Sequence, residues 1–228
     1  MPEFADTALD QLRARADARK ASEMAAYHKA DRMYFGVANP VIDNLSREWR
    51  AELDVPGRVA LAAALWKSDI HEARIAAAKL LTQARIRPDT AVWELIAAWV
   101  PSFDAWAVAD HASIAGQKRL VADPARLDLV ELWTISEHMW SRRAALVMTL
   151  PSTKQIHPGP PELDARERIL GWAATYTTDR NWFIQKAVAW WLRDLSKRDP
   201  GRVRQFLAAH GAAMKPFARK TAAKYLTD

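Results

Sequence analysis

Helical periodicity recurs along the whole chain and is broken at short intervals by proline, aspartate or serine. The sequence has only 7 glycines, and alanine dominates its apolar residues. Both features favour helix over strand, since glycine weakens regular structure and alanine has the highest helix propensity. The pattern therefore predicts an all-α fold of short helices joined by tight turns.

The boundaries of these helices follow from their start and stop signals. Pro40, Pro56 and Pro124 each stand where a helix is expected to begin, because proline fits the first turn of a helix. The HPGPP run at 157–161 predicts a loop within the domain, because clustered proline and glycine stop a helix. We expect helices over residues 4–29, 39–52, 56–66, 69–84, 88–99, 103–115, 124–136, 138–150, 161–177, 180–197, 200–210 and 215–226.

Paired short helices over more than about 150 residues are typical of an α-solenoid of HEAT-like helical repeats. The fourth expected helix shows the required apolar stripe, formed by Ile70, Ile75, Leu80 and Leu81. We therefore predict a single domain over residues 1–228, with a concave groove suited to a large ligand. A compact all-α bundle is the alternative architecture.

Positive charge is concentrated at the C-terminal end. The formal net charge is +6, and the residues from Arg180 onward hold 11 of the 33 Lys/Arg but only 3 of the 27 Asp/Glu. The sequence pI is about 9.7. A basic surface of this kind indicates either contact with nucleic-acid phosphates or a solvated helical face.

Several classes of site are not expected. The chain has no cysteine, which excludes disulfides and thiolate metal sites and fits a reducing cytoplasm. No apolar run reaches the roughly 20 residues that span a membrane, and the polar N-terminus is not a signal peptide. His71-Glu72 lacks the second histidine of a zinc motif, and there is no glycine-rich phosphate loop. We expect no cofactor, no metal and no membrane association.

Trp106 and Asp110 lie four residues apart in the run FDAWAVADH. On a helix this spacing places an indole and a carboxylate on one face, where they could meet a cationic or electron-poor substrate. Arg143 and Trp190, in two later helices, are candidate partners. A solvated helix face is the other interpretation of Asp110.

The chain contains 11 tryptophans, and most are expected in the core. Trp190 and Trp191 are adjacent, so their side chains point about 100° apart on a helix. One of the two is therefore expected to face a cleft. The tryptophans expected in the core are Trp49, Trp66, Trp93, Trp99, Trp133 and Trp172.

Four segments together resemble the bacterial DNA alkylation repair glycosylases of the AlkD type, which are HEAT-like-repeat proteins. They are MAAYHKADRMYFGVANP, WAVAD, MWSRRAALV and NWFIQKAVAWWLRDLSK. The resemblance covers roughly residues 20–227, and FIQKAxxWxLR is its most specific motif. One departure is Ala105, where a tryptophan is common in that family.

The resemblance implies roles for individual residues. Asp110 matches the catalytic carboxylate and Trp106 the tryptophan before it. Trp190 matches the second tryptophan of the cleft and Arg143 the active-site arginine, while Tyr27 matches a tyrosine near the lesion. The expected DNA contacts are Tyr27, Arg142, Lys186 and Arg193.

The implied activity is hydrolysis of the N-glycosidic bond of cationic N3- or N7-alkylated purines in duplex DNA. A carboxylate about 4 Å from the developing positive charge on the sugar offers on the order of 4 kcal/mol at an effective dielectric near 20. The implied protein is a bacterial, cytoplasmic monomer that acts on double-stranded alkylated DNA. A helical-repeat protein that binds DNA or damage without catalysis is the first alternative, and a protein-interaction scaffold is the second.

Overall fold

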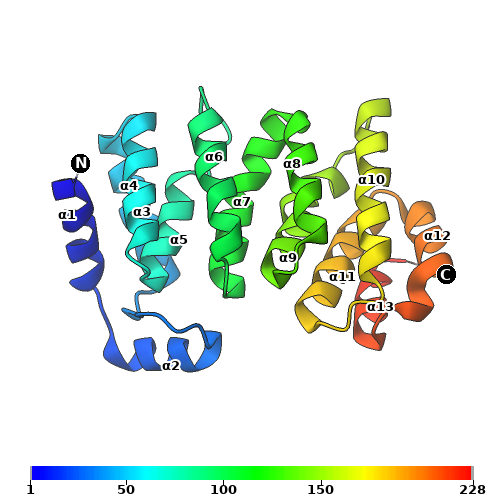
Figure 1. The fold of residues 1–228 in the computed structure, drawn as a ribbon, viewed down its shortest axis with the longest axis horizontal. Coiled ribbons are helices and arrows are strands. Elements are labelled where there is room, and N and C mark those ends of the chain that lie inside the picture. Colours follow the sequence, from blue (N-terminus) through cyan, green and yellow to red (C-terminus); the bar gives the residue numbers. More distant parts are fainter. Residues whose placement is uncertain (1, 227–228) are drawn as a thin grey trace. The chain divides into compact units, whose positions relative to one another are not determined.

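The computed structural model describes residues 2–226, which form thirteen α-helices, five short 3-10 helices and one isolated β-bridge. This part of the chain forms two compact units, one ending at Asp123 and the other beginning at Pro124. The α-helices of both units are labelled in Figure 1. The single domain remains a prediction.

The first unit is built around a buried helix, α5 (His71–Leu80). This helix packs against α1 (Pro2–Arg13), α3 (Asn39–Glu52), α4 (Val55–Lys67) and α7 (Trp106–Ala122). Its predicted apolar stripe is confirmed, because Ile70, Ile75, Leu80 and Leu81 are all buried. The remaining helices of this unit are α2 (Ala18–His28) and α6 (Thr90–Trp99).

The second unit is built in the same way around α11 (Trp182–Ser196). This helix packs against α9 (Met139–Met148), α10 (Pro160–Tyr176), α12 (Pro200–His210) and α13 (Pro216–Ala222). The sixth α-helix of the unit is the short α8 (Leu127–Leu132). The expected loop at HPGPP is confirmed up to Gly159, since Pro160 already begins α10.

The first predicted helix, over residues 4–29, is wrong, because the chain breaks there into α1 and α2. Asp17 caps α2 with its side chain, which accepts a hydrogen bond from the backbone N–H of Lys20. The backbone N–H of Asp17 donates to the carbonyl of Phe35 at 2.8 Å. A tertiary contact with the 35–36 segment thus ends the helical run. As a result α2 lies crosswise to α3 and α4 in Figure 1.

Other boundaries differ by smaller amounts. The predicted 103–115 helix begins at Trp106 and continues to Ala122. The predicted 124–136 helix is a six-residue α-helix between two 3-10 turns. The predicted 39–52 helix, by contrast, has the bounds of α3, and Ala38 stands at its N-cap position without a side-chain hydrogen bond.

Five of the six tryptophans predicted to lie in the core are buried. Trp49, Trp66, Trp93, Trp99 and Trp172 are buried, whereas Trp133 is only half-buried. Trp191 is fully buried and Trp190 half-buried, as expected from their 100° separation on the helix. Trp133 stands in a 3-10 turn, which places it off the stripe of a continuous helix.

Candidate functional site

Trp106 and Asp110 lie on the first turns of α7 and are both half-buried. The three residues between them, Ala107, Val108 and Ala109, are buried in the core of the first unit. The buried face of α7 therefore points inward, and the predicted pair shares the more accessible face. Ala105, the departure from the family pattern, is itself buried and precedes the helix as its N-cap.

Tyr27, on α2, is brought against this face. Its ring meets the indole of Trp106 edge to face, with centroids 6.1 Å apart and planes at 88°. The phenol itself is 69 % exposed. Within the first unit, the structure therefore places two predicted aromatic residues side by side, next to the carboxylate-bearing turn of α7.

Three aromatic residues that the sequence did not single out complete this cluster. The imidazole of His28 lies 5.4 Å from the indole of Trp106 and 4.5 Å from the imidazole of His71. The ring of Tyr34 stacks on His71 at 4.8 Å. These residues come from three separate segments, and no spacing in the sequence connects them. We refer to Tyr27, His28, Tyr34, His71 and Trp106 as the aromatic cluster.

The loop between α2 and α3 is fixed by Glu72, a fully buried carboxylate at the start of α5. It accepts hydrogen bonds from the backbone N–H groups of Phe35, Gly36 and Val37 at 3.0, 2.7 and 3.2 Å. The backbone N–H of His71 donates to the carbonyl of Met33 at 3.0 Å. This loop follows α2 directly, so Glu72 fixes the segment that comes after Tyr27 and His28.

A group of ion pairs fixes the segment that precedes Trp106 of the aromatic cluster. The buried guanidinium of Arg32 pairs with Asp104, two residues before Trp106, and lies 3.6 Å from Asp69. Arg74 binds the same Asp69 at 2.9 Å. Opposite charges within this distance stabilise one another most when one partner is shielded from water. The pairs therefore tie the segment before α7 to the turn before α5.

The histidines of this region are kept uncharged by burial. Burial, with smaller contributions from His28, Arg32 and His111, lowers the pKa of His71 to about 3. Burial likewise lowers the pKa of His28, against the opposing influence of Glu72. For His111, beside Asp110, burial lowers the pKa to about 4, although the carboxylate itself favours the charged ring. At neutral pH these rings carry no charge.

In the second unit, Arg143 is buried on α9 with its guanidinium carbon 5.7 Å from the centre of the Trp140 ring. Trp140 in turn contacts Phe183, with ring centroids 4.7 Å apart. The contact places a cation against an aromatic face, an arrangement in which the two groups attract each other. The predicted arginine is therefore held in a fixed position by an aromatic neighbour.

The predicted residues of α11 have different surroundings. Lys186 is exposed, with its ammonium 4.6 Å from the centre of the Trp182 ring. The indole N–H of Trp190 donates to the Asp194 carboxylate at 3.1 Å, and Arg193 donates to the other oxygen of that carboxylate. Asp194 thus fixes both Trp190 and Arg193 on one side of α11.

Arg142 is engaged in structural contacts. Its guanidinium donates to the carbonyls of Ser136 and Glu137 at 2.8 Å each and pairs with Asp179 at 3.1 Å. The hydroxyl oxygen of Tyr176 lies 3.1 Å from the carbonyl oxygens of both Thr134 and Arg142, which share its single proton. The contact of Arg142 with DNA remains a prediction.

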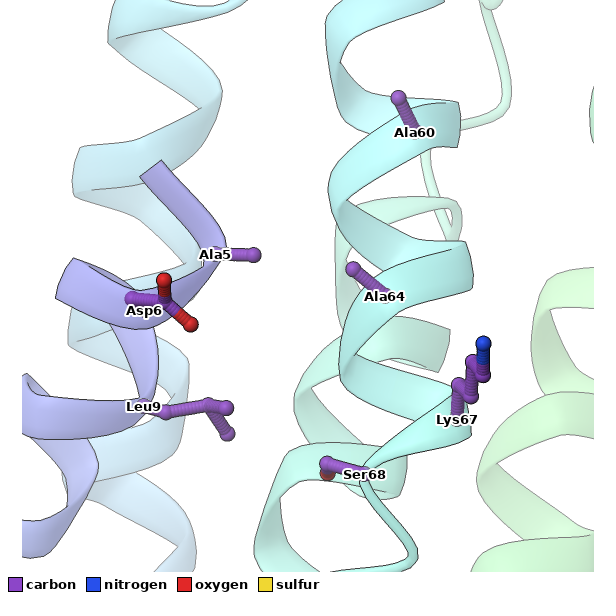
Figure 2. Close-up of a pocket in the computed structure, with 7 residues that line it drawn as sticks. All are labelled: Ala5, Asp6, Leu9, Ala60, Ala64, Lys67 and Ser68. Atoms are coloured by element: carbon purple, nitrogen blue, oxygen red, sulfur yellow. The ribbon is translucent and has the colours of Figure 1, made fainter. Parts of the chain in front are cut away.

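A cavity of about 480 Å³ lies elsewhere in the first unit, between α1 and α4 (Figure 2). Small side chains of the two helices face each other across it, among them Ala5 and Ala64. None of the predicted site residues lines this cavity. Among residues 2–226, no group of three or more histidine, aspartate or glutamate side chains could hold a metal ion.

No helix in the described part of the chain is long and apolar enough to cross a membrane. The basic C-terminal residues are partly paired with acidic and aromatic side chains. Arg202 forms two hydrogen bonds of 2.8 Å with Glu167, and Lys197 lies over the ring of Tyr225. The excess of positive charge from Arg180 onward lies in the second unit.

Three solved structures have the same fold. A predicted DNA alkylation repair enzyme from Enterococcus faecalis matches with a TM-score of 0.79 and 22% identity, over 94% of this chain and 98% of its own. AlkD2 from Streptococcus mutans matches with a TM-score of 0.61 and 18% identity, over 84% and 91%. The protein smu.31 from Streptococcus mutans UA159 matches with a TM-score of 0.60 and 19% identity, over 82% and 92%. The predicted all-α, helical-repeat class is confirmed.

A search of curated proteins gave no match. The family model described as DNA alkylation repair enzyme matches residues 8–226, nearly the whole sequence. This match agrees with the four motifs and with the fold. The chain belongs to the DNA alkylation repair enzyme family.

Proposed function

We propose that this protein is a monofunctional DNA glycosylase that releases cationic N3- or N7-alkylated purines from duplex DNA in base excision repair. The observation that carries the proposal is the half-buried Asp110, one helical turn along α7 from Trp106, which belongs to the aromatic cluster. Such a site suits a substrate that is cationic before the reaction and develops positive charge on its sugar.

In the proposed reaction the bond between the sugar C1′ and the base nitrogen breaks. The electron pair leaves with the base, which becomes neutral, and the sugar becomes an oxocarbenium-like cation. Asp110 stabilises that cation and orients a water molecule, whose oxygen bonds to C1′ while its proton is taken up by the carboxylate or by solvent. At about 4 Å and an effective dielectric near 20 the attraction is on the order of 4 kcal/mol, and half of it accounts for more than a tenfold rate gain.

The aromatic residues would also stabilise the positive charge of the substrate. The indole face of Trp106 would favour a cationic base, with Tyr27 bordering the lesion. For Trp190, in the second unit, we propose the same preference for positive charge. The uncharged histidines of the cluster add no positive charge that would oppose the cation. No cofactor or metal ion enters this proposal.

The remaining predicted residues would bind the DNA backbone. Arg143, fixed against Trp140, would contact a phosphate with one edge of its guanidinium, since little of the residue is exposed. Lys186, Arg193 and Arg142 would add further phosphate contacts, which position the duplex without reading its sequence. We propose that a monomer holds the duplex in a concave groove of the repeat, in the bacterial cytoplasm at the nucleoid.

The test is release of 7-methylguanine from methylated duplex DNA by the wild type, Asp110→Asn and a control, Asp164→Asn. Asp164 is an exposed residue of α10 in the other unit. We expect release by the wild type and the control, and a loss of at least about tenfold in Asp110→Asn. Equal release by Asp110→Asn would eliminate the proposed role of the carboxylate. Duplex binding without release of any alkylated base by the wild type would favour a protein that binds damage without catalysis.

A further inference from the structure

His28 occupies the centre of the aromatic cluster. It is the last residue of α2, and the chain leaves the helix through Lys29, which has a positive φ of 59°. The ring of His28 lies 5.1 Å from that of Tyr27 and 5.4 Å from that of Trp106. On its other side it lies 4.5 Å from His71. His28 therefore stands between the two predicted substrate-facing rings and the interior of the first unit.

The helix that carries His28 has few other attachments. Of the eleven residues of α2, none is buried. The start of α2 is held by Asp17, through its bond to Phe35, and by the close approach of Gly36. At the opposite end, the described ring contacts are those of Tyr27 and His28. The position of Tyr27 thus depends on how firmly His28 is seated.

The histidine ring is an unusual choice for this position. His71 is 1 % exposed, and neither of its ring nitrogens has a hydrogen-bond partner among the described residues. The Nδ1 atom of His28 is likewise buried without a partner there. A buried polar atom without a partner costs stability that a phenyl ring would not cost. The described contacts of the two imidazoles are therefore ring contacts, which an uncharged phenyl ring could also make.

Charge is the property in which imidazole differs from phenyl. The titratable and charged residues around the two rings are Arg32 and Tyr34 of the loop, Glu72 of α5 and His111 of α7. Burial disfavours the charged form of both histidines. A proton on His28 would place a positive charge on a ring whose centroid lies 5.4 Å from that of the Trp106 indole, where it would oppose a cationic base.

We propose that His28 is a positioning residue, which seats Tyr27 and Trp106 against a cationic base and does so only as an uncharged ring. The claim that His28 helps to orient Tyr27 and Trp106 toward a cationic base rests on the proposed glycosylase function. The claim that His28 positions Trp106 does not, because the contact between the His28 and Trp106 rings can be observed in the protein without DNA.

The experiment uses the full chain labelled with 5-fluorotryptophan, in which the ¹⁹F resonance missing from Trp106→Phe identifies Trp106. The variants are His28→Ala, His28→Phe and a control, His210→Ala, which removes an exposed histidine packed on Phe206 at 5.0 Å in the other unit. Circular dichroism and thermal melts establish that each variant is folded. Release of 7-methylguanine is measured from pH 5 to pH 8.

We expect the Trp106 resonance to move in His28→Ala and to stay in place in the control. In the wild type it should shift as the pH falls below 6.5, and this titration should be absent from His28→Phe. At pH 7, kcat/KM should fall at least tenfold in His28→Ala and return to within threefold of the wild type in His28→Phe. In the pH profile of 7-methylguanine release, the loss of activity on the acid side should occur at lower pH for His28→Phe than for the wild type.

A Trp106 resonance that is the same in His28→Ala and the wild type would overturn the positioning role. A loss of activity on the acid side that is unchanged in His28→Phe would overturn the requirement for an uncharged ring. Absence of base release by the wild type would instead defeat the proposed glycosylase function and the claim about the base, while the fluorine spectra would still decide the contact with Trp106.

Discussion

The phenol ring of Tyr27 meets the indole of Trp106 edge to face, with the ring centroids 6.1 Å apart. Tyr27 lies in the last turn of α2 and Trp106 is the first residue of α7, and α3, α4, α5 and α6 lie between them in the sequence. Their contact therefore depends on the loop that follows α2 and on the turn that precedes α7. The predictions below test the residues that fix these segments and the expected contact with DNA.

Gly36→Ala should destabilise the first unit strongly. Gly36 has a φ of +78°, and a Cβ atom there would lie 2.2 Å from the carbonyl oxygen of Asp17. Both the backbone conformation and the clash oppose alanine, so we expect a loss of about 3 kcal/mol or more in the free energy of unfolding. Urea denaturation measures this loss.

Gly171→Ala provides the matched control. Gly171 lies within α10, and a Cβ atom there would meet nothing within 4 Å. Alanine is the better helix former by about 0.5–1 kcal/mol, so this variant should be slightly more stable than the wild type. If the two glycine variants had the same stability, the strain assigned to Gly36 would be wrong.

Glu72→Gln should also destabilise the protein, by about 2–4 kcal/mol in the free energy of unfolding. The carboxylate accepts three backbone N–H groups in a fully buried place. An amide has only one acceptor oxygen and would turn its own NH₂ toward a donor. The exposed Glu94, on α6, gives the control Glu94→Gln, which should change the unfolding free energy by less than about 0.5 kcal/mol.

His71→Phe should make the free energy of unfolding depend less on pH between pH 7 and pH 4. The pKa of His71 falls from 6.5 in the unfolded chain to about 3 in the folded protein, mainly through burial. The unfolded state thus binds the proton more readily, and the stability that is present above pH 6.5 is lost as the pH falls toward 3. A tenfold change in proton affinity corresponds to about 1.4 kcal/mol.

Unfolding free energies at pH 7, 6, 5 and 4 check this prediction. The wild type should lose stability over this range more steeply than His71→Phe, and some loss should remain because the pKa of His111 is also lowered, to about 4. The exposed His157 supplies the control His157→Phe, which should follow the wild type. Parallel curves for the wild type and His71→Phe would contradict the assignment.

Lys186→Ala should lower the affinity for duplex DNA, and that affinity should depend less steeply on salt concentration. Each phosphate contact contributes about 0.9 to the slope of log K against log salt concentration, so removal of one contact should lower the slope by about that amount. Fluorescence anisotropy between 50 and 200 mM salt measures it. The control is Arg202→Ala, because Arg202 is already paired with Glu167 and should not contribute to the slope. An unchanged slope in Lys186→Ala would remove this residue from the DNA contact.

Much of the helical framework could be predicted from local sequence. Pro56 and Pro200 stand in the first turns of α4 and α12, and the stripe of Ile70 and Leu80 is buried as its spacing requires. Trp106 and Asp110 share the accessible face of α7 for the same reason. These features depend on residues within a few positions of each other, and the periodicity of the helix relates such residues directly.

The sequence by itself determined the helical class, most of the helix starts, the family and the pairing of Trp106 with Asp110 on one helix. Only the tertiary structure decided that α1 and α2 are separate helices and that His28 and His71 join Tyr27 and Trp106 in one cluster. Both outcomes depend on Glu72 and Gly36, which fix a loop against distant backbone. Periodicity cannot reveal such contacts, because they are made by residues far apart in the chain whose meeting is set by packing and by buried hydrogen bonds.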